Sequence, residues 1–102
     1  MNSSYAFYSN LSARYLREGE KTFEDICRRV AWAVADEEEE ATRFFDIMIS
    51  LRFLPNSPTL MNAGTDLGQL SACFVLPVPD SINGIFDAMK NGAIIHKTGG
   101  GT

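Results

Sequence analysis

The sequence predicts an α+β chain in two parts: a helical region over residues 1–54, then a strand and a long helix within residues 55–102. Three observations predict this division. Apolar residues recur at helical spacing through the first part, a continuous apolar run of strand length lies in the second, and a stretch rich in Pro and Gly separates them. With 102 residues the chain has the size of one domain at most.

The first part is predicted to hold a short helix over residues 5–17 and then a pair of longer ones. Gly19 is a natural end for the first helix, and Thr22 is a typical N-cap for the second. The apolar positions of the second helix are Phe23, Ile26, Cys27, Val30 and Val34. Those of the third are Ala41, Phe44, Phe45, Met48 and either Leu51 or Leu54. We expect an antiparallel pair with Cys27 in its core.

Net charge and hydropathy exclude several classes of protein. The net charge is −4, and the acidic run at residues 36–40 supplies more than this excess, so no basic surface for nucleic acid is expected. The run itself is typical of a solvated helix start. No apolar run approaches the roughly 18 residues that span a bilayer, and the first residues lack the features of a secretory signal. We therefore expect a cytoplasmic protein that binds neither nucleic acid nor membranes.

The stretch from Leu54 to Cys73 concentrates the candidate functional groups. Pro55 and Pro58 fix their own φ angles and are expected to hold Ser57 on extended backbone with its hydroxyl free. A loop follows that favours positive φ at its polar and glycine positions, Asn62, Gly64, Asp66 and Gly68.

Cys73 lies within LSACFVLPV, which has the length and composition of a buried strand. Two interpretations stay open. The loop and thiol could form an active-site edge, or a surface turn could precede a core strand that carries an inert thiol.

A long helix is predicted after the strand, capped by Asp80 or Ser81. Its inner face is predicted to contain Ile82, Ile85, Phe86, Met89, Ala93 and His96. Three consecutive glycines then leave bare backbone N–H groups that a ligand can approach. The sequence has one His and two distant Cys, so we expect no metal site within the chain and a reducing compartment.

Three motifs, in order NSPTLMNAGT, QLSACFV and PDSINGIFDAMKNGAIIHKTGGGT, resemble the start of the catalytic subunit of ribonucleotide reductases. The SACF and HKTGGGT forms are most similar to the adenosylcobalamin-dependent, class II branch. The resemblance implies that residues 1–54 are the family's N-terminal helical region. Residues 55–102 would then be the truncated start of its ten-stranded α/β barrel, with the first strand and helix. The implied reaction is radical-based reduction of ribonucleoside diphosphates, or triphosphates, to deoxyribonucleotides.

The resemblance also implies site residues. Cys73 matches one of two thiols that supply the reducing electrons, and the partner thiol lies outside this chain. The substrate-binding positions are Ser57 at the diphosphate, Ala72, Cys73 and Gly101. The positions that contact a deoxynucleoside triphosphate effector are Asp80, Ser81 and Ile82.

The implied cofactor is adenosylcobalamin, bound mainly by other parts of the enzyme, with a dithiol such as thioredoxin as reductant. The implied partners are the remainder of the reductase chain, the substrate, the effector and a second copy in a homodimer. The radical thiol and the acid–base residues of the family fall beyond Thr102, so we expect the 102 residues alone to be inactive. The competing function is a small non-enzymatic helical interaction module in which Cys73 is a core residue.

Overall fold

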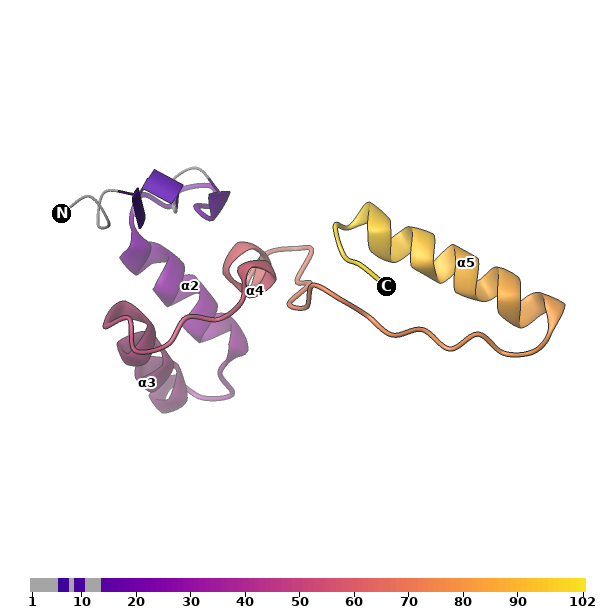
Figure 1. Ribbon diagram of the computed structural model, residues 1–102. Helices are drawn as coiled ribbons and strands as arrows, with labels where there is room; N and C mark the ends of the chain where they lie inside the picture. The colour runs from indigo at the N-terminus through magenta and orange to yellow at the C-terminus, as the bar shows by residue number, and fades with distance from the viewer. Residues whose placement is uncertain (1–5, 8, 11–13) are drawn as a thin grey trace. The chain divides into compact units, whose positions relative to one another are not determined.

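The computed structural model describes residues 6–7, 9–10 and 14–102. Its labelled helices are α2 (Phe23–Val34), α3 (Glu38–Ile49), α4 (Ser57–Asn62) and α5 (Ile82–Lys97) (Figure 1). The chain divides into a first unit, Met1–Leu70, and a second unit, Ser71–Thr102, which are described separately. None of the helices in these described ranges is long and apolar enough to cross a membrane.

The start of the predicted first helix lies partly outside the described residues. Residues 6, 7, 9, 10 and 14 are helical, whereas Tyr5, Tyr8 and Leu11 of the predicted helix lie outside the described residues. Gly19 adopts a φ of 83°, the left-handed conformation that glycine reaches without strain.

The predicted cap of α2 is confirmed, and it is a reciprocal capping box. The Thr22 hydroxyl accepts a hydrogen bond from the backbone N–H of Asp25 at 3.2 Å. The Asp25 carboxylate in turn accepts from the backbone N–H groups of Lys21 at 2.9 Å and Thr22 at 3.2 Å. The bond from Lys21, with smaller contributions from Thr22 and Arg28, holds the pKa of Asp25 below its ordinary value. Two N–H groups that the helix cannot satisfy thus find partners.

Helices α2 and α3 pack as the predicted hairpin around one small core. The buried core residues are Phe23, Ile26, Cys27, Val30, Ala31, Ala41, Met48, Leu60 and Ala63. Three apolar positions expected in this core are exposed instead: Val34, Leu51 and Leu54. Val34 is the last residue of α2, and Leu51 lies beyond the end of α3 with a φ of 60°. Both are therefore at the ends of their helices, outside the packed part of the hairpin. The acidic run begins α3 on the surface, as predicted.

The predicted strand is wrong for the described residues, and with it the α+β class. Residues 70–78 are irregular, and the only pairing is a single parallel bridge between Cys73 and Gly101. Strands need a neighbour along their length, and in the second unit Gly101 alone offers one. Val75 is 99% exposed, so its side chain has no core to enter. The described fold is all-helical, and the ten-stranded barrel is not part of it.

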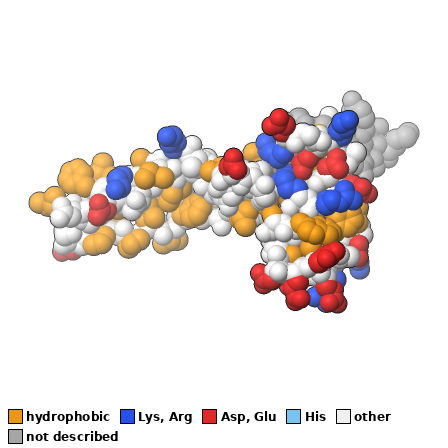
Figure 2. Space-filling view, turned by 180° about the vertical axis from the view of Figure 1, so that it is seen from behind, with side chains coloured by type: hydrophobic (Ala, Val, Ile, Leu, Met, Phe, Trp, Pro, Cys, Tyr) orange, Lys and Arg blue, Asp and Glu red, His pale blue; other side chains and the backbone are white. Residues whose placement is uncertain are grey.

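Helix α5 has its predicted cap but not its predicted inner face. The Ser81 hydroxyl accepts from the backbone N–H of Gly84 at 2.9 Å, and the helix runs through Asn91 and Gly92 without ending. All six residues predicted to face inward are exposed: Ile82, Ile85, Phe86, Met89, Ala93 and His96. Figure 2 shows apolar side chains spread over the surface of the second unit. The second unit contains only one helix and an irregular segment, so this face has no second helix there to pack against.

Candidate functional site

The second unit brings together three of the predicted substrate-site residues, Ala72, Cys73 and Gly101. The N–H of Gly101 donates to the carbonyl of Ala72 at 2.8 Å. The N–H of Phe74 donates to the carbonyl of Gly101, also at 2.8 Å. These two bonds form the parallel bridge between Cys73 and Gly101. The glycine-rich end of the chain is thereby held beside the thiol.

The thiol side of this bridge is open. Cys73 is exposed, and a Cβ added at Gly101 would lie 4.0 Å from its Sγ and 3.9 Å from the carbonyl oxygen of Ala72. Both distances are ordinary contacts, so within the described residues nothing excludes a side chain at position 101. A requirement for glycine at this position would therefore have to come from a ligand.

A groove of about 370 Å³ lies next to the bridge in the second unit. Its lining residues are Phe74, Val75, Leu76, Val78, Ala88, Gly92 and Thr102. The volume falls within the range of small-molecule sites, and the lining is mainly apolar.

Cys27 has the opposite environment and confirms its prediction as a core thiol. It lies on α2 and is fully buried in the core that this helix forms with its neighbours. Burial raises the pKa of this thiol to about 11, because the thiolate would lose its hydration. Cys27 is therefore unsuited to serve as a reactive thiol.

Ser57 belongs to the first unit, and its local structure differs from the prediction. It is not extended but is the first residue of α4, where the Asn56 side chain caps the helix by accepting from the N–H of Thr59 at 3.0 Å. Pro58 fits the first turn because its missing N–H would have no partner there anyway. The Ser57 hydroxyl is not free, since it lies 2.8 Å from the hydroxyl of Tyr15. In the following loop Gly64 and Gly68 have the predicted positive φ angles, 77° and 60°, whereas the prediction is wrong for Asn62 and Asp66, whose φ angles are not positive.

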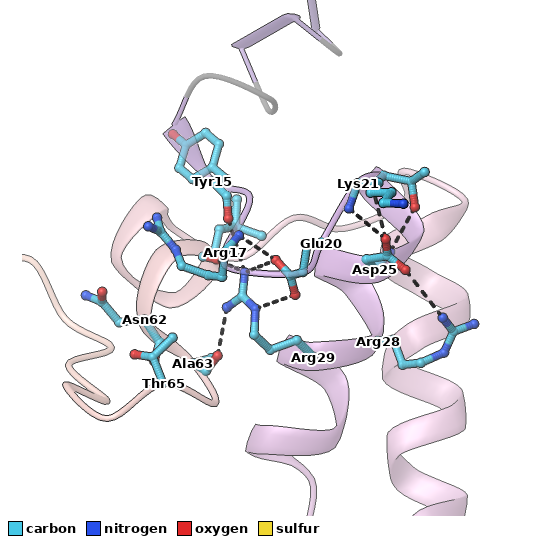
Figure 3. Close-up of polar contacts among 12 residues, drawn as sticks. Tyr15, Arg17, Glu20, Lys21, Asp25, Arg28, Arg29, Asn62, Ala63 and Thr65 are labelled. Atoms are coloured by element: carbon cyan, nitrogen blue, oxygen red, sulfur yellow. Dashed lines mark hydrogen bonds and ion pairs between the residues drawn. The ribbon is translucent and has the colours of Figure 1, made fainter.

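Sequence reasoning missed Arg29, whose guanidinium bonds to Glu20 and Ala63 in Figure 3. Its Nε donates to Glu20 at 2.7 Å, and both side chains are only 12% exposed. Its two terminal nitrogens donate to three backbone carbonyls, those of Ala63 at 2.7 Å, Leu60 at 2.9 Å and Tyr15 at 3.2 Å. One guanidinium thus joins α2, the end of α4 and the segment that precedes α2. The only signal for this role in the sequence is that position 29 borders the apolar stripe of α2.

The predicted effector residues lie together at the start of α5. The Ser81 hydroxyl is engaged in the cap, whereas the Asp80 side chain is exposed and Ile82 is 75% exposed. The effector role of these three residues stays a prediction. Within the described ranges, no group of three or more His, Cys, Asp or Glu residues could hold a metal ion.

The competing prediction of a non-enzymatic module required Cys73 to be a buried core residue. The exposed position of Cys73 contradicts that requirement. The core that does exist is built from the first unit, and its only thiol is Cys27.

Comparisons with known proteins match most of the chain. A family model described as "Ribonucleotide reductase, all-alpha domain" matches residues 1–68. A vitamin B12-dependent ribonucleoside-diphosphate reductase of Thermoplasma acidophilum is 55% identical over 91 residues, covering 86% of this chain and 12% of that protein. The corresponding reductase of Mycobacterium tuberculosis is 43% identical over 113 residues, covering 97% of this chain and 16% of that protein.

A ribonucleoside-diphosphate reductase large chain of Schizosaccharomyces pombe is 45% identical over 75 residues, covering 72% of this chain and 9% of that protein. The chain therefore spans between 9% and 16% of the length of these three relatives.

Proposed function

The chain belongs to the ribonucleotide reductase family, as an N-terminal part of the catalytic subunit similar to the B12-dependent branch, and on this premise we propose that it takes part in reducing ribonucleotides to deoxyribonucleotides. The 55% identity over 86% of the chain carries this proposal. The names of the similar proteins specify ribonucleoside diphosphates, and we propose the same substrate class here. A cytoplasmic location suits a reaction that consumes free thiols.

We assign Cys73 the role of one redox-active thiol. In the reaction, the Cys73 thiol and a second thiol outside this chain each give up one electron and one proton. The ribose loses its 2′-hydroxyl as water and gains a hydrogen, and the two sulfurs join as a disulfide. This pairing requires Cα atoms about 4.4–6.8 Å apart. An external dithiol, such as thioredoxin, then reduces the disulfide. The exposure of Cys73 supports a role that requires access to substrate and reductant.

Ser57, Ala72 and Gly101 are proposed to bind the substrate. The Ser57 hydroxyl can donate to a diphosphate oxygen. The backbone of Ala72 and Gly101 would contact the nucleotide, since the bridge holds both beside the thiol. The assignment of residues 1–54 to the helical region, with the catalytic part starting at residue 55, stays a prediction.

The similar B12-dependent proteins support adenosylcobalamin as the cofactor of the complete enzyme. When bound, this cofactor supplies the radical. The described residues contain no cluster of metal-ligating side chains, and the groove in the second unit is mainly apolar. We propose that adenosylcobalamin is bound mainly by other parts of the reductase.

A direct test uses a complete reductase that carries this sequence. With adenosylcobalamin, a dithiol and a ribonucleoside diphosphate it should form the deoxyribonucleotide, which chromatography of the products measures. The 102-residue chain alone should form none, because it offers only one exposed thiol. Product formation by the chain alone, or none by the complete enzyme, would overturn the proposal.

Asp80, Ser81 and Ile82 are proposed to contact a deoxynucleoside triphosphate effector, in an enzyme that acts as a homodimer. The alternative role of Asp80, as the cap of α5, is weakened because Ser81 provides that cap. The start of a helix suits the phosphates. We assign the Asp80 carboxylate to the sugar or base, since phosphate would repel it.

In the complete enzyme, Asp80→Ala should therefore weaken the effect of the effector on substrate selectivity. The coupling between two such sites usually changes affinity by about 5- to 150-fold, and the variant should lose most of that factor. The maximal rate should change little. Product ratios from mixed substrates, with and without each effector, measure this effect. Ser81→Ala serves as the control for a lost cap and should lower thermal stability, which Asp80→Ala should not. Unchanged selectivity in Asp80→Ala would remove the effector role.

A further inference from the structure

The hydroxyl groups of Tyr15 and Ser57 lie 2.8 Å apart, although the two residues are distant in sequence. We infer that Tyr15 is a positioning residue, which orients the Ser57 hydroxyl toward the diphosphate of the substrate. The inference rests on the proposed role of Ser57 and adds a residue that the sequence motifs did not single out.

The Tyr15–Ser57 pair has one more hydroxyl proton than the bond between the two residues uses. Two hydroxyl groups have two protons, and the bond between them uses one. Either hydroxyl could donate in this geometry; because a phenol is the better donor and an aliphatic hydroxyl the better acceptor, we assign Tyr15 as the donor to Ser57 Oγ. The proton of Ser57 then points away from Tyr15. Neither hydroxyl has another hydrogen-bond partner among the described residues, and Ser57 is exposed, so this proton can reach a ligand.

The backbone around the pair is fixed by a single side chain. Arg29 donates to the carbonyl of Tyr15 and to that of Leu60, which lies in the short helix that begins with Ser57. The segment that carries Tyr15 and the short helix that carries Ser57 are thus both bonded to the same guanidinium. A preorganised donor loses less entropy when it binds phosphate than a freely rotating hydroxyl would.

The charges near Tyr15 also favour an anion. The Arg14 guanidinium lies 5.5 Å from the centroid of the Tyr15 ring, within the range of a cation–π contact. Neither Arg14 nor Arg17 forms an ion pair within the described part of the chain, and Arg17 Nε is buried without a hydrogen-bond partner there. The Glu20 carboxylate pairs with Arg29 instead. Three arginines, including Arg29, therefore stand against two carboxylates of this segment, Glu18 and Glu20, which leaves an excess of positive charge.

The test compares Tyr15→Phe, Ser57→Ala and the double variant in the complete reductase. Tyr15→Phe keeps the ring beside Arg14 and removes only the hydroxyl. It should raise KM for the ribonucleoside diphosphate about 2- to 10-fold, the range for one neutral hydrogen bond, with kcat nearly unchanged. Ser57→Ala should raise KM about 10-fold or more, since a bond to a charged phosphate is stronger. The double variant should be no worse than Ser57→Ala.

Two further measurements separate positioning from general loosening of the structure. The inhibition constant of inorganic pyrophosphate, used as a competitor, should rise in Tyr15→Phe by the same factor as KM. Thr59→Val is the matched control. Its hydroxyl lies on the same short helix but donates to the carbonyl of Leu70 at 3.0 Å, so both constants should stay unchanged.

The outcomes distinguish the two levels of the proposal. If Ser57→Ala leaves both constants unchanged, Ser57 does not bind the diphosphate and the proposed role itself fails. If Ser57→Ala raises them but Tyr15→Phe does not, only the inference about Tyr15 is overturned. It is also overturned if Tyr15→Phe raises them equally with and without Ser57, because Tyr15 would then act independently.

Discussion

Replacing Cys73 with serine should abolish multiple turnovers of the complete reductase, while leaving its fold intact. Serine preserves the size and polarity of the exposed side chain but cannot form a disulfide, so it cannot supply reducing electrons. The measurement is the amount of deoxyribonucleotide formed per enzyme with excess dithiol. Sustained turnover by Cys73→Ser would remove the redox role of this residue.

Cys27 is the matched control for this experiment. Cys27→Ala should lower stability, because it creates a small cavity in the core, and should leave turnover per folded enzyme unchanged. Alkylation of the native protein checks the premise. Iodoacetamide should modify Cys73, whereas Cys27 should resist modification until the protein is denatured, because burial hides the thiol and raises its pKa to about 11. Rapid alkylation of Cys27 in the native protein would contradict the packing of the core.

Features governed by local rules could be predicted from the sequence. The Thr22 cap, the positive φ angles of Gly64 and Gly68 and the surface position of the acidic run each depend on a few neighbouring residues. The pairing of α2 with α3 also follows from sequence, because a short connection leaves two amphipathic helices few other arrangements. The position of Cys27 on the apolar stripe predicts its burial, and its side chain is fully buried.

Features that need a distant partner could not be predicted in the same way. The apolar run around Cys73 has the composition of a buried strand, but composition does not supply the neighbouring strands that would bury it. The apolar residues of α5 show the same limit, since they are exposed in the second unit. An apolar pattern reports what a segment can bury, and burial itself depends on which other elements are present.

The candidate site was partly predictable for a similar reason. The resemblance placed Ala72, Cys73 and Gly101 in one site, and the bridge brings these three together. The Pro58 that follows Ser57 predicts extended backbone and a free hydroxyl at Ser57. The side-chain cap of Asn56 instead begins a helix at Ser57, and a bond to Tyr15 engages the hydroxyl. No local pattern could have indicated that bond.

Replacing Arg29 with methionine should lower the free energy of unfolding of the 102-residue chain by about 3–5 kcal/mol, as expected when one partner of a buried ion pair is removed. The Glu20 carboxylate would keep its charge in a site where only 12% of the side chain is exposed. The carbonyls of Leu60 and Ala63 would also lose a donor. Urea denaturation followed by circular dichroism measures the change. The expected loss is a large fraction of the roughly 5–15 kcal/mol by which a typical domain is stable against unfolding.

Arg28 is the matched control, because it precedes Arg29 on α2 but forms its ion pairs, with Glu24 at 3.2 Å and Asp25 at 3.8 Å, on the surface. The Arg28 and Glu24 side chains are 54% and 57% exposed, so Arg28→Met should cost only about 1 kcal/mol. The variant that combines Glu20→Met with Arg29→Met should regain part of the loss, because it no longer leaves a charge buried and unpaired. If Arg29→Met costs no more than Arg28→Met, the guanidinium does not hold these elements together. The fixed backbone of the Tyr15–Ser57 pair would then need another explanation.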